Sequence, residues 1–106
     1  MSVFNGATCN AASQSNCATA ASFSLALFPS LPPVVDETTH TVYVPQAGTG
    51  ALDFVAMING STCNGTVTSG CRNTPPLVQV GDDVAQVVVD PTTSTVYVIS
   101  EESTKI

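Results

Sequence analysis

The amino-acid sequence predicts an all-β protein made of two similar units. Only 9% of its 106 residues are charged, while Thr, Ser, Val and Ala are abundant; so many β-branched residues and so few helix formers favour strands. No stretch spaces its apolar residues at the 3.6-residue period of a helix over three turns. We therefore expect a helix content near zero, and we expect short strands separated by polar turns.

The chain repeats itself at an interval of 54 residues. Without a gap, this shift aligns residues 1–52 with 55–106 at 16 identical positions, which cluster in motifs. The motifs are Asn-Gly at 5 and 59, Thr-Cys-Asn at 8 and 62, Val-Val-Asp at 34 and 88, and Thr-Val-Tyr-Val at 41 and 95. A fixed period of this length indicates a duplicated supersecondary unit. We predict one segment, residues 1–106, with repeat 1 at about 1–54 and repeat 2 at about 55–106.

Each repeat is predicted to contain four short antiparallel strands. In repeat 1 the turn at 37–40 (Glu-Thr-Thr-His) separates the last two, and the strands are residues 2–5, 23–28, 33–36 and 41–44. In repeat 2 the Pro-Pro pair at 75–76 excludes a helix and Pro91 begins the matching turn, a corner position that proline favours. The strands there are residues 51–58, 77–80, 84–90 and 95–99.

Four antiparallel strands repeated at this interval are typical of β-propeller blades. Residues 87–98 (Val-Val-Val-Asp-Pro-Thr-Thr-Ser-Thr-Val-Tyr-Val) resemble the YVTN-type β-propeller repeat, and residues 34–44 carry the same pattern with Glu37 in place of proline. Residues 58–64, with Ser-Gly-Cys at 69–71 and Thr-Pro-Pro at 74–76, are similar to a disulfide-bearing variant in bacterial extracellular members. The resemblance covers both repeats, and departs at 23–28, where Phe-Ser-Leu-Ala-Leu-Phe replaces the usual Val-x-Val-Gly ending.

The phase of the repeat predicts a half blade, a whole blade and a second half blade. The family's blade begins near Val34 or Val88, so the whole blade spans about residues 33–80. Propellers need about four to eight blades to close, and uncovered half blades expose unpaired edges. We expect strand exchange between chains, which gives a homo-oligomer: a closed trimer or tetramer, or a filament. The alternative is a piece of a longer or engineered propeller with no ligand of its own.

The four cysteines are expected to form two local disulfides. Cys9 and Cys17 are eight positions apart, as are Cys63 and Cys71, and the repeat places the two pairs in different units. Closing a loop of this length stabilises the fold by about 2–3 kcal/mol in the entropic model. A zinc site is the alternative, but Cys-x7-Cys is a poor ligand spacing, and there is one histidine. Disulfides indicate an oxidising compartment, so we expect an extracellular or cell-surface location.

Asp36 and Asp90 recur at the end of a valine-rich strand, directly before a turn. A carboxylate at this position caps the turn by accepting backbone N–H bonds. The alternative is a ring of carboxylates at the propeller mouth that binds Ca²⁺ or another hard cation. We favour capping and expect no metal, no cofactor and no catalytic residue, because the one histidine, His40, lies in a turn and has Ser94 as its counterpart.

The charge balance excludes two classes of partner. Two basic residues, Arg72 and Lys105, stand against eight acidic ones, which leaves no cationic surface for nucleic acid or for anionic lipid. No apolar run is long enough for membrane insertion. We therefore predict a non-enzymatic extracellular scaffold that self-assembles and presents loops for binding or surface structure. The alternative is a fragment of a propeller enzyme of the lyase, lactonase or dehydrogenase type, whose chemistry needs clustered His, Glu or Arg or a cofactor pocket.

Overall fold

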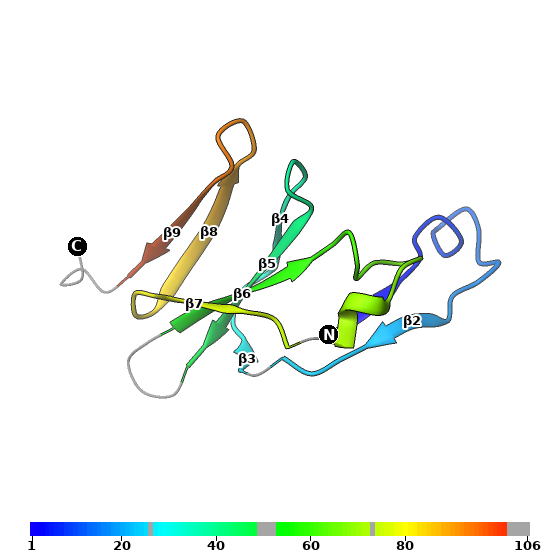
Figure 1. Ribbon diagram of the computed structural model, residues 1–106, viewed down its shortest axis with the longest axis horizontal. Helices are drawn as coiled ribbons and strands as arrows, with labels where there is room; N and C mark the ends of the chain where they lie inside the picture. The colour runs from blue at the N-terminus through cyan, green and yellow to red at the C-terminus, as the bar shows by residue number, and fades with distance from the viewer. Residues whose placement is uncertain (26, 49–52, 73, 102–106) are drawn as a thin grey trace.

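The computed structural model describes residues 1–25, 27–48, 53–72 and 74–101. This part of the chain forms three antiparallel sheets of two, five and two strands, which confirms the all-β class (Figure 1). The strands are β1 (Ser2–Phe4), β2 (Thr19–Ser22), β3 (Phe28–Pro29), β4 (Val34–Asp36), β5 (Thr41–Ala47), β6 (Asp53–Asn59), β7 (Leu77–Val80), β8 (Val84–Asp90) and β9 (Thr95–Ser100). The described residues include one 3₁₀ turn, η1 (Ser69–Arg72), and no helix among them is long and apolar enough to cross a membrane.

The middle sheet is an antiparallel meander. β3 and β4 lie end to end along one edge of β5, which pairs with β6 over its full length, and β6 pairs with β7. Pro45 lies inside β5, although proline cannot donate to a ladder. It lies opposite the interruption between β3 and β4, where no strand partner needs its missing N–H. The carbonyl oxygen of Pro45 still accepts a hydrogen bond from the Ser30 N–H at 3.0 Å.

The main core lies on one face of the middle sheet. Its buried members come from β5, β6 and the second disulfide loop: Val44, Ala56, Ile58, Cys63 and Cys71. The first sheet and the segment after it cover this face with the half-buried side chains of Val3, Ala21, Phe23 and Leu25. On the other side, the Asp53 carboxylate of β6 accepts a hydrogen bond from the Val84 N–H at 3.0 Å, which ties β8 to the middle sheet.

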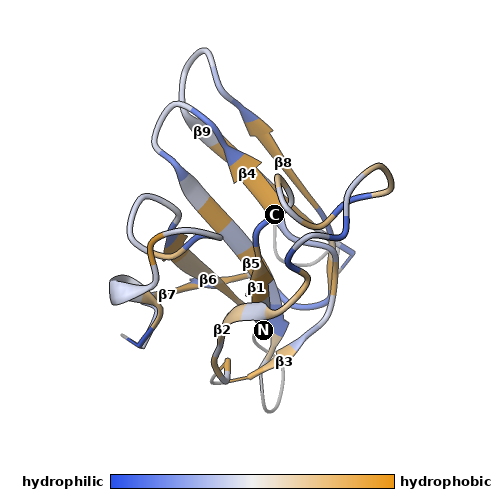
Figure 2. Cartoon of the chain, turned by 90° about the vertical axis from the view of Figure 1, so that its right-hand side faces the viewer, coloured by the Kyte–Doolittle hydropathy of each residue, from blue (hydrophilic) through white to orange (hydrophobic). Residues whose placement is uncertain are grey.

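The three sheets form an elongated row. The molecule measures 51 × 31 × 25 Å and its radius of gyration is 15.1 Å, whereas a compact domain of about 100 residues has a value of about 13 Å. Figure 1 places the β8–β9 hairpin and the end that carries β2 on opposite sides of the middle sheet. In Figure 2, β8 is hydrophobic along most of its length although it belongs to a sheet of only two strands. Both terminal sheets therefore carry apolar residues without a complete sheet around them.

The prediction of a strand at residues 23–28 is wrong. β2 ends at Ser22, and Phe28 belongs to β3, which pairs with β5 instead. Met1 and Phe23 exchange two backbone hydrogen bonds, of 2.6 and 2.9 Å. Residues after Phe23 therefore lie beyond the N-terminal end of β1 and have no partner on that strand. The other seven predicted strands are present with small differences at their ends; residues 51 and 52 of the expected strand 51–58 lie outside the described residues.

Candidate functional site

The two disulfide loops follow β1 and β6 and share several hydrogen-bonded turns, although the 3₁₀ turn η1 is part of the second loop and an isolated β-bridge, Cys9 with Gln14, is part of the first. The disulfides join the predicted partners, with Cα atoms 4.8 Å apart in each: Cys9 with Cys17, and Cys63 with Cys71. Each loop starts at an asparagine: Asn5 directly follows β1, and Asn59 is the last residue of β6. The backbone carbonyl of this asparagine accepts a hydrogen bond from the first cysteine's N–H at 3.0 Å in both loops. Its side-chain oxygen accepts the N–H two residues later, at 2.9 and 3.0 Å. This Asx turn starts both loops.

A second asparagine closes each loop on itself. The side-chain N–H of Asn10 donates to the Gly6 carbonyl at 2.8 Å, and that of Asn64 donates to the Gly60 carbonyl at 2.7 Å. The side-chain oxygens accept backbone N–H bonds two and three residues later. The role of these asparagines in organising the loops was not predicted from the sequence. Their identity in both repeats, combined with the tendency of asparagine to bond its own backbone, was the available signal.

Asp36 and Asp90 lie at the start of the two tight turns and accept hydrogen bonds from the turn. The Oδ1 atom of Asp36 accepts from the Thr38 N–H at 3.0 Å and from the Thr38 hydroxyl at 2.5 Å. Asp90 accepts the same pair from Thr92 at 3.1 and 2.5 Å. In each case the pKa of the aspartate carboxyl lies below its usual value of 3.8, and the largest cause is the hydrogen bond from the threonine hydroxyl. Hydrogen bonds donated to the ionised carboxylate stabilise that form and so lower the pKa. Among the described residues, no group of three or more His, Cys, Asp or Glu is placed to hold a metal ion.

The two turns also touch each other. The Thr38 hydroxyl shares a hydrogen bond of 3.0 Å with the Ser94 hydroxyl. This contact covers Asp36, which is fully buried, while its counterpart Asp90 stays partly exposed. His40 and Ser94 occupy the same turn position, with left-handed φ angles of 53° and 50°. The two repeats thus share the backbone conformation of this position although its side chains differ.

Replacing Thr38 by valine is expected to raise the Asp36 pKa and to reduce the acid sensitivity of the fold. A carboxyl whose pKa is lowered on folding stabilises the folded state at any pH above the pKa that it has in the unfolded chain, about 4. This contribution is lost as the pH falls through the lowered pKa of the folded state. NMR titration and acid unfolding measure both effects. Thr92→Val is the matched control, because it acts on Asp90 instead. An unchanged Asp36 pKa in Thr38→Val would contradict this account.

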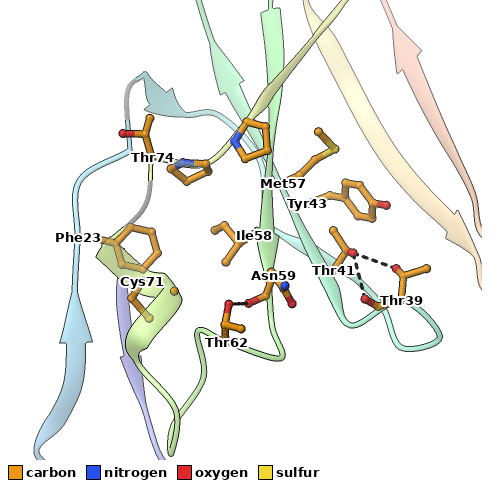
Figure 3. Close-up of a pocket in the computed structure, with 13 residues that line it drawn as sticks. Phe23, Thr39, Thr41, Tyr43, Met57, Ile58, Asn59, Thr62, Cys71 and Thr74 are labelled. Atoms are coloured by element: carbon orange, nitrogen blue, oxygen red, sulfur yellow. Dashed lines mark hydrogen bonds between the residues drawn. The ribbon is translucent and has the colours of Figure 1, made fainter.

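A pocket of about 440 Å³ opens beside the end of β6 that β7 leaves unpaired. In Figure 3, Phe23, Ile58 and Met57 line it together with the ring of Tyr43, and threonine hydroxyls and Asn59 add polar groups. Its described lining holds no Asp, Glu, His, Lys or Arg. A second pocket, of about 650 Å³, lies between the N-terminus and β3 and is mainly apolar.

The terminal sheets expose residues whose repeat counterparts are buried. Ile58 on β6 is 5% exposed, and its counterpart Phe4 on β1 is 55% exposed. Val44 on β5 is 4% exposed, and its counterpart Val98 on β9 is only half-buried. The same residue positions are thus buried where β5 and β6 pair and uncovered where the pairing partner is missing.

Comparisons of this chain with protein-family models, with curated proteins and with solved structures find no match. The resemblance to YVTN-type repeats therefore stays a prediction.

Proposed function

We propose that this protein is a non-enzymatic extracellular scaffold that assembles with copies of itself into a β-propeller. In this proposal the middle sheet is a whole blade, and β1–β2 and β8–β9 are two halves of another. The 54-residue repeat supports the assignment, because it relates β8 and β9 to β4 and β5, and β1 to β6. β2 pairs with β1 as β7 pairs with β6, so the two terminal sheets together supply four blade strands in this proposal, divided between the two ends of the chain.

The contrast in exposure between repeat counterparts carries this proposal. Burying a large apolar side chain contributes about 1.5–3 kcal/mol, and Phe4 forgoes most of that gain in a single chain although Ile58 obtains it. An assembly that completes the terminal sheets would bury Phe4 in the way that β5 and the core bury Ile58. Self-association therefore explains why the repeat places apolar residues at positions that one chain leaves exposed.

An apolar patch on the β8–β9 hairpin supports the same conclusion. Val88, Tyr97 and Ile99 are 41%, 54% and 51% exposed. Val88 and Tyr97 face each other across the strands, and Ile99 lies on the same face of β9 by alternation. Exposed apolar patches of this kind mark interaction sites in soluble proteins. In the proposed propeller this face packs against the next blade.

The disulfide loops are the elements that the scaffold would present. Both are polar and held in one shape by a disulfide and two asparagines. The first loop is mostly exposed, whereas the second is mostly half-buried and contributes its cysteines to the core. Rigid loops on a stable framework are a common basis for binding. The two disulfides indicate an oxidising, extracellular-type environment, which is consistent with a secreted or surface-attached assembly.

The mass of the native protein in solution tests the proposed function. Multi-angle light scattering over a range of concentrations is expected to give three or four times the chain mass of 10.8 kDa for a closed ring, or a mass that grows with concentration for a filament. A cooperatively melting protein whose mass stays at that of one chain would overturn the proposal.

A further inference from the structure

We infer that β9 of one copy pairs with β1 of the next in one defined antiparallel register, with Tyr97 opposite Val3 of the neighbouring copy. This inference rests on the proposed function and specifies the contact that builds the assembly. Within one chain, β5 pairs with β6 so that Tyr43 lies opposite Met57 and Val44 lies opposite Ala56. In the 54-residue repeat, β9 is the counterpart of β5 and β1 is the counterpart of β6. If the counterparts pair in the same register, the pairs between copies are Thr95 with Asn5, Val96 with Phe4, Tyr97 with Val3, and Val98 with Ser2.

The free hydrogen-bonding groups of both strands fit this register. Along an edge strand, alternate residues direct their N–H and C=O groups toward one neighbour and the others away from it. Met1, directly before β1, exchanges two hydrogen bonds with Phe23, directly after β2. By alternation Ser2 and Phe4 direct their backbone groups away from β2, because the register shift between Val3 and Phe4 places its extra residue, Ala20, on β2 and not on β1. These are the two residues of β1 that the register pairs by hydrogen bonds.

The same test holds for β9. Glu101 donates its N–H to the Asp83 carbonyl beside β8 at 2.9 Å, so Val96 and Val98 direct their backbone groups away from β8. The proposed register pairs Val96 with Phe4 and Val98 with Ser2. In both pairs, the backbone N–H and C=O groups of the two residues point toward the neighbouring copy and can bond to each other. A slip by one residue would set free groups against groups already bonded within each sheet, and would turn each apolar face to the wrong side.

The register also unites two apolar surfaces. Val3 packs against the core of the middle sheet, and side chains directly opposite each other in a sheet lie on one face. Pairing Tyr97 with Val3 therefore places the exposed patch of Val88, Tyr97 and Ile99 on the face that already covers that core. In the completed sheet, the β8–β9 half therefore extends the apolar face with which the β1–β2 half covers the core of the middle sheet.

Gly6 supplies the first arm of the test. Its counterpart Gly60 donates its N–H to the His40 carbonyl at 2.6 Å, and a Cβ atom on Gly60 would lie 2.8 Å from that oxygen. The register gives Gly6 the same position against the Ser94 carbonyl of the next copy. A Cβ on Gly6 meets nothing within 4 Å inside its own chain. Gly6→Ala is therefore expected to leave the fold of the chain intact and to raise the dissociation constant of the assembly at least tenfold, about the effect of one lost buried backbone bond. No change in assembly would overturn the register.

Disulfide trapping supplies the second arm. Tyr97 and Val3 form a pair without mutual hydrogen bonds, for which the Cα atoms lie about 4.5 Å apart, within the range that a disulfide bridges. The double variant V3C/Y97C, oxidised and run on a denaturing gel without reductant, is expected to give covalent multimers that end at the ring size. F4C/Y97C is the matched control, because its two cysteines would point to opposite faces, and at least about tenfold less cross-linking is expected.

The outcomes separate the two levels of the proposal. Single-chain mass together with no cross-linked species would overturn the proposed function and the register alike. If the mass shows an assembly but F4C/Y97C cross-links as readily as V3C/Y97C, the proposed assembly is supported and only the register is overturned. Circular dichroism of each variant, matched to the unmodified protein, confirms that the strands form.

Discussion

Val96→Pro is expected to convert the assembled protein into folded monomers. The N–H of Val96 faces away from β8, as the Glu101–Asp83 bond indicates, so proline removes no hydrogen bond from the β8–β9 hairpin. On an edge strand, proline is tolerated where its nitrogen faces solvent, but it prevents another strand from pairing there. The change removes a donor in the proposed junction and leaves the facing carbonyl of Phe4 unpaired.

An unpaired buried carbonyl costs about 1–3 kcal/mol, which corresponds to about a 5- to 150-fold weaker junction. A closed ring repeats this loss at every junction, so the effect on the ring is larger. Val96→Thr is the matched control, because threonine keeps both the N–H and the β-branched shape. Light scattering and circular dichroism report mass and fold together. A proline variant that assembles at the same concentrations as the threonine variant would contradict the account.

Removing the second disulfide is expected to destabilise the chain much more than removing the first. Both disulfides close loops of the same length, so both losses cost about 2–3 kcal/mol through the unfolded state. Cys63 and Cys71 are 6% and 4% exposed and belong to the core, whereas Cys9 is half-buried and Cys17 is exposed. Serine at the two buried positions adds hydroxyl groups that cost about 1–3 kcal/mol each when they lack a partner.

The experiment compares C63S/C71S with C9S/C17S by urea unfolding, in the Val96→Pro background so that assembly does not contribute to the measured free energy. The first double variant is expected to lose at least about 2 kcal/mol more than the second. Equal losses would show that the core does not depend on the second loop.

The sequence was sufficient for the parts of the fold that local chemistry decides. The turns after Asp36 and Asp90 and the hairpins around them follow from Asp-x-Thr chemistry that both repeats share, and the strands that flank them were predicted within a few residues. Pairing of the cysteines within each loop followed from the repeat, which places the two equivalent pairs in different units.

Tertiary contacts decided what the sequence could not predict. β2 ends opposite Ser2, where β1 begins, and Phe28 pairs with β5 because an edge of β5 is free there. Neither condition is visible in residues 23–28 alone. Gln46 is fully buried, and its side-chain oxygen accepts a hydrogen bond from the Leu27 N–H at 2.8 Å. No repeat or motif marks this glutamine. The pocket likewise combines Phe23 with residues of β5, β6 and the second loop, which only the fold brings together.

Amide hydrogen exchange of the native protein tests the central claim most directly. Phe4, Val96 and Val98 have Ile58, Val42 and Val44 as their repeat counterparts. If neighbouring chains complete each other's sheets, the amides of the first three residues are protected to a similar degree as those of the second three. If they exchange as freely as amides on an open strand edge in the concentrated protein, β9 and β1 do not pair between chains.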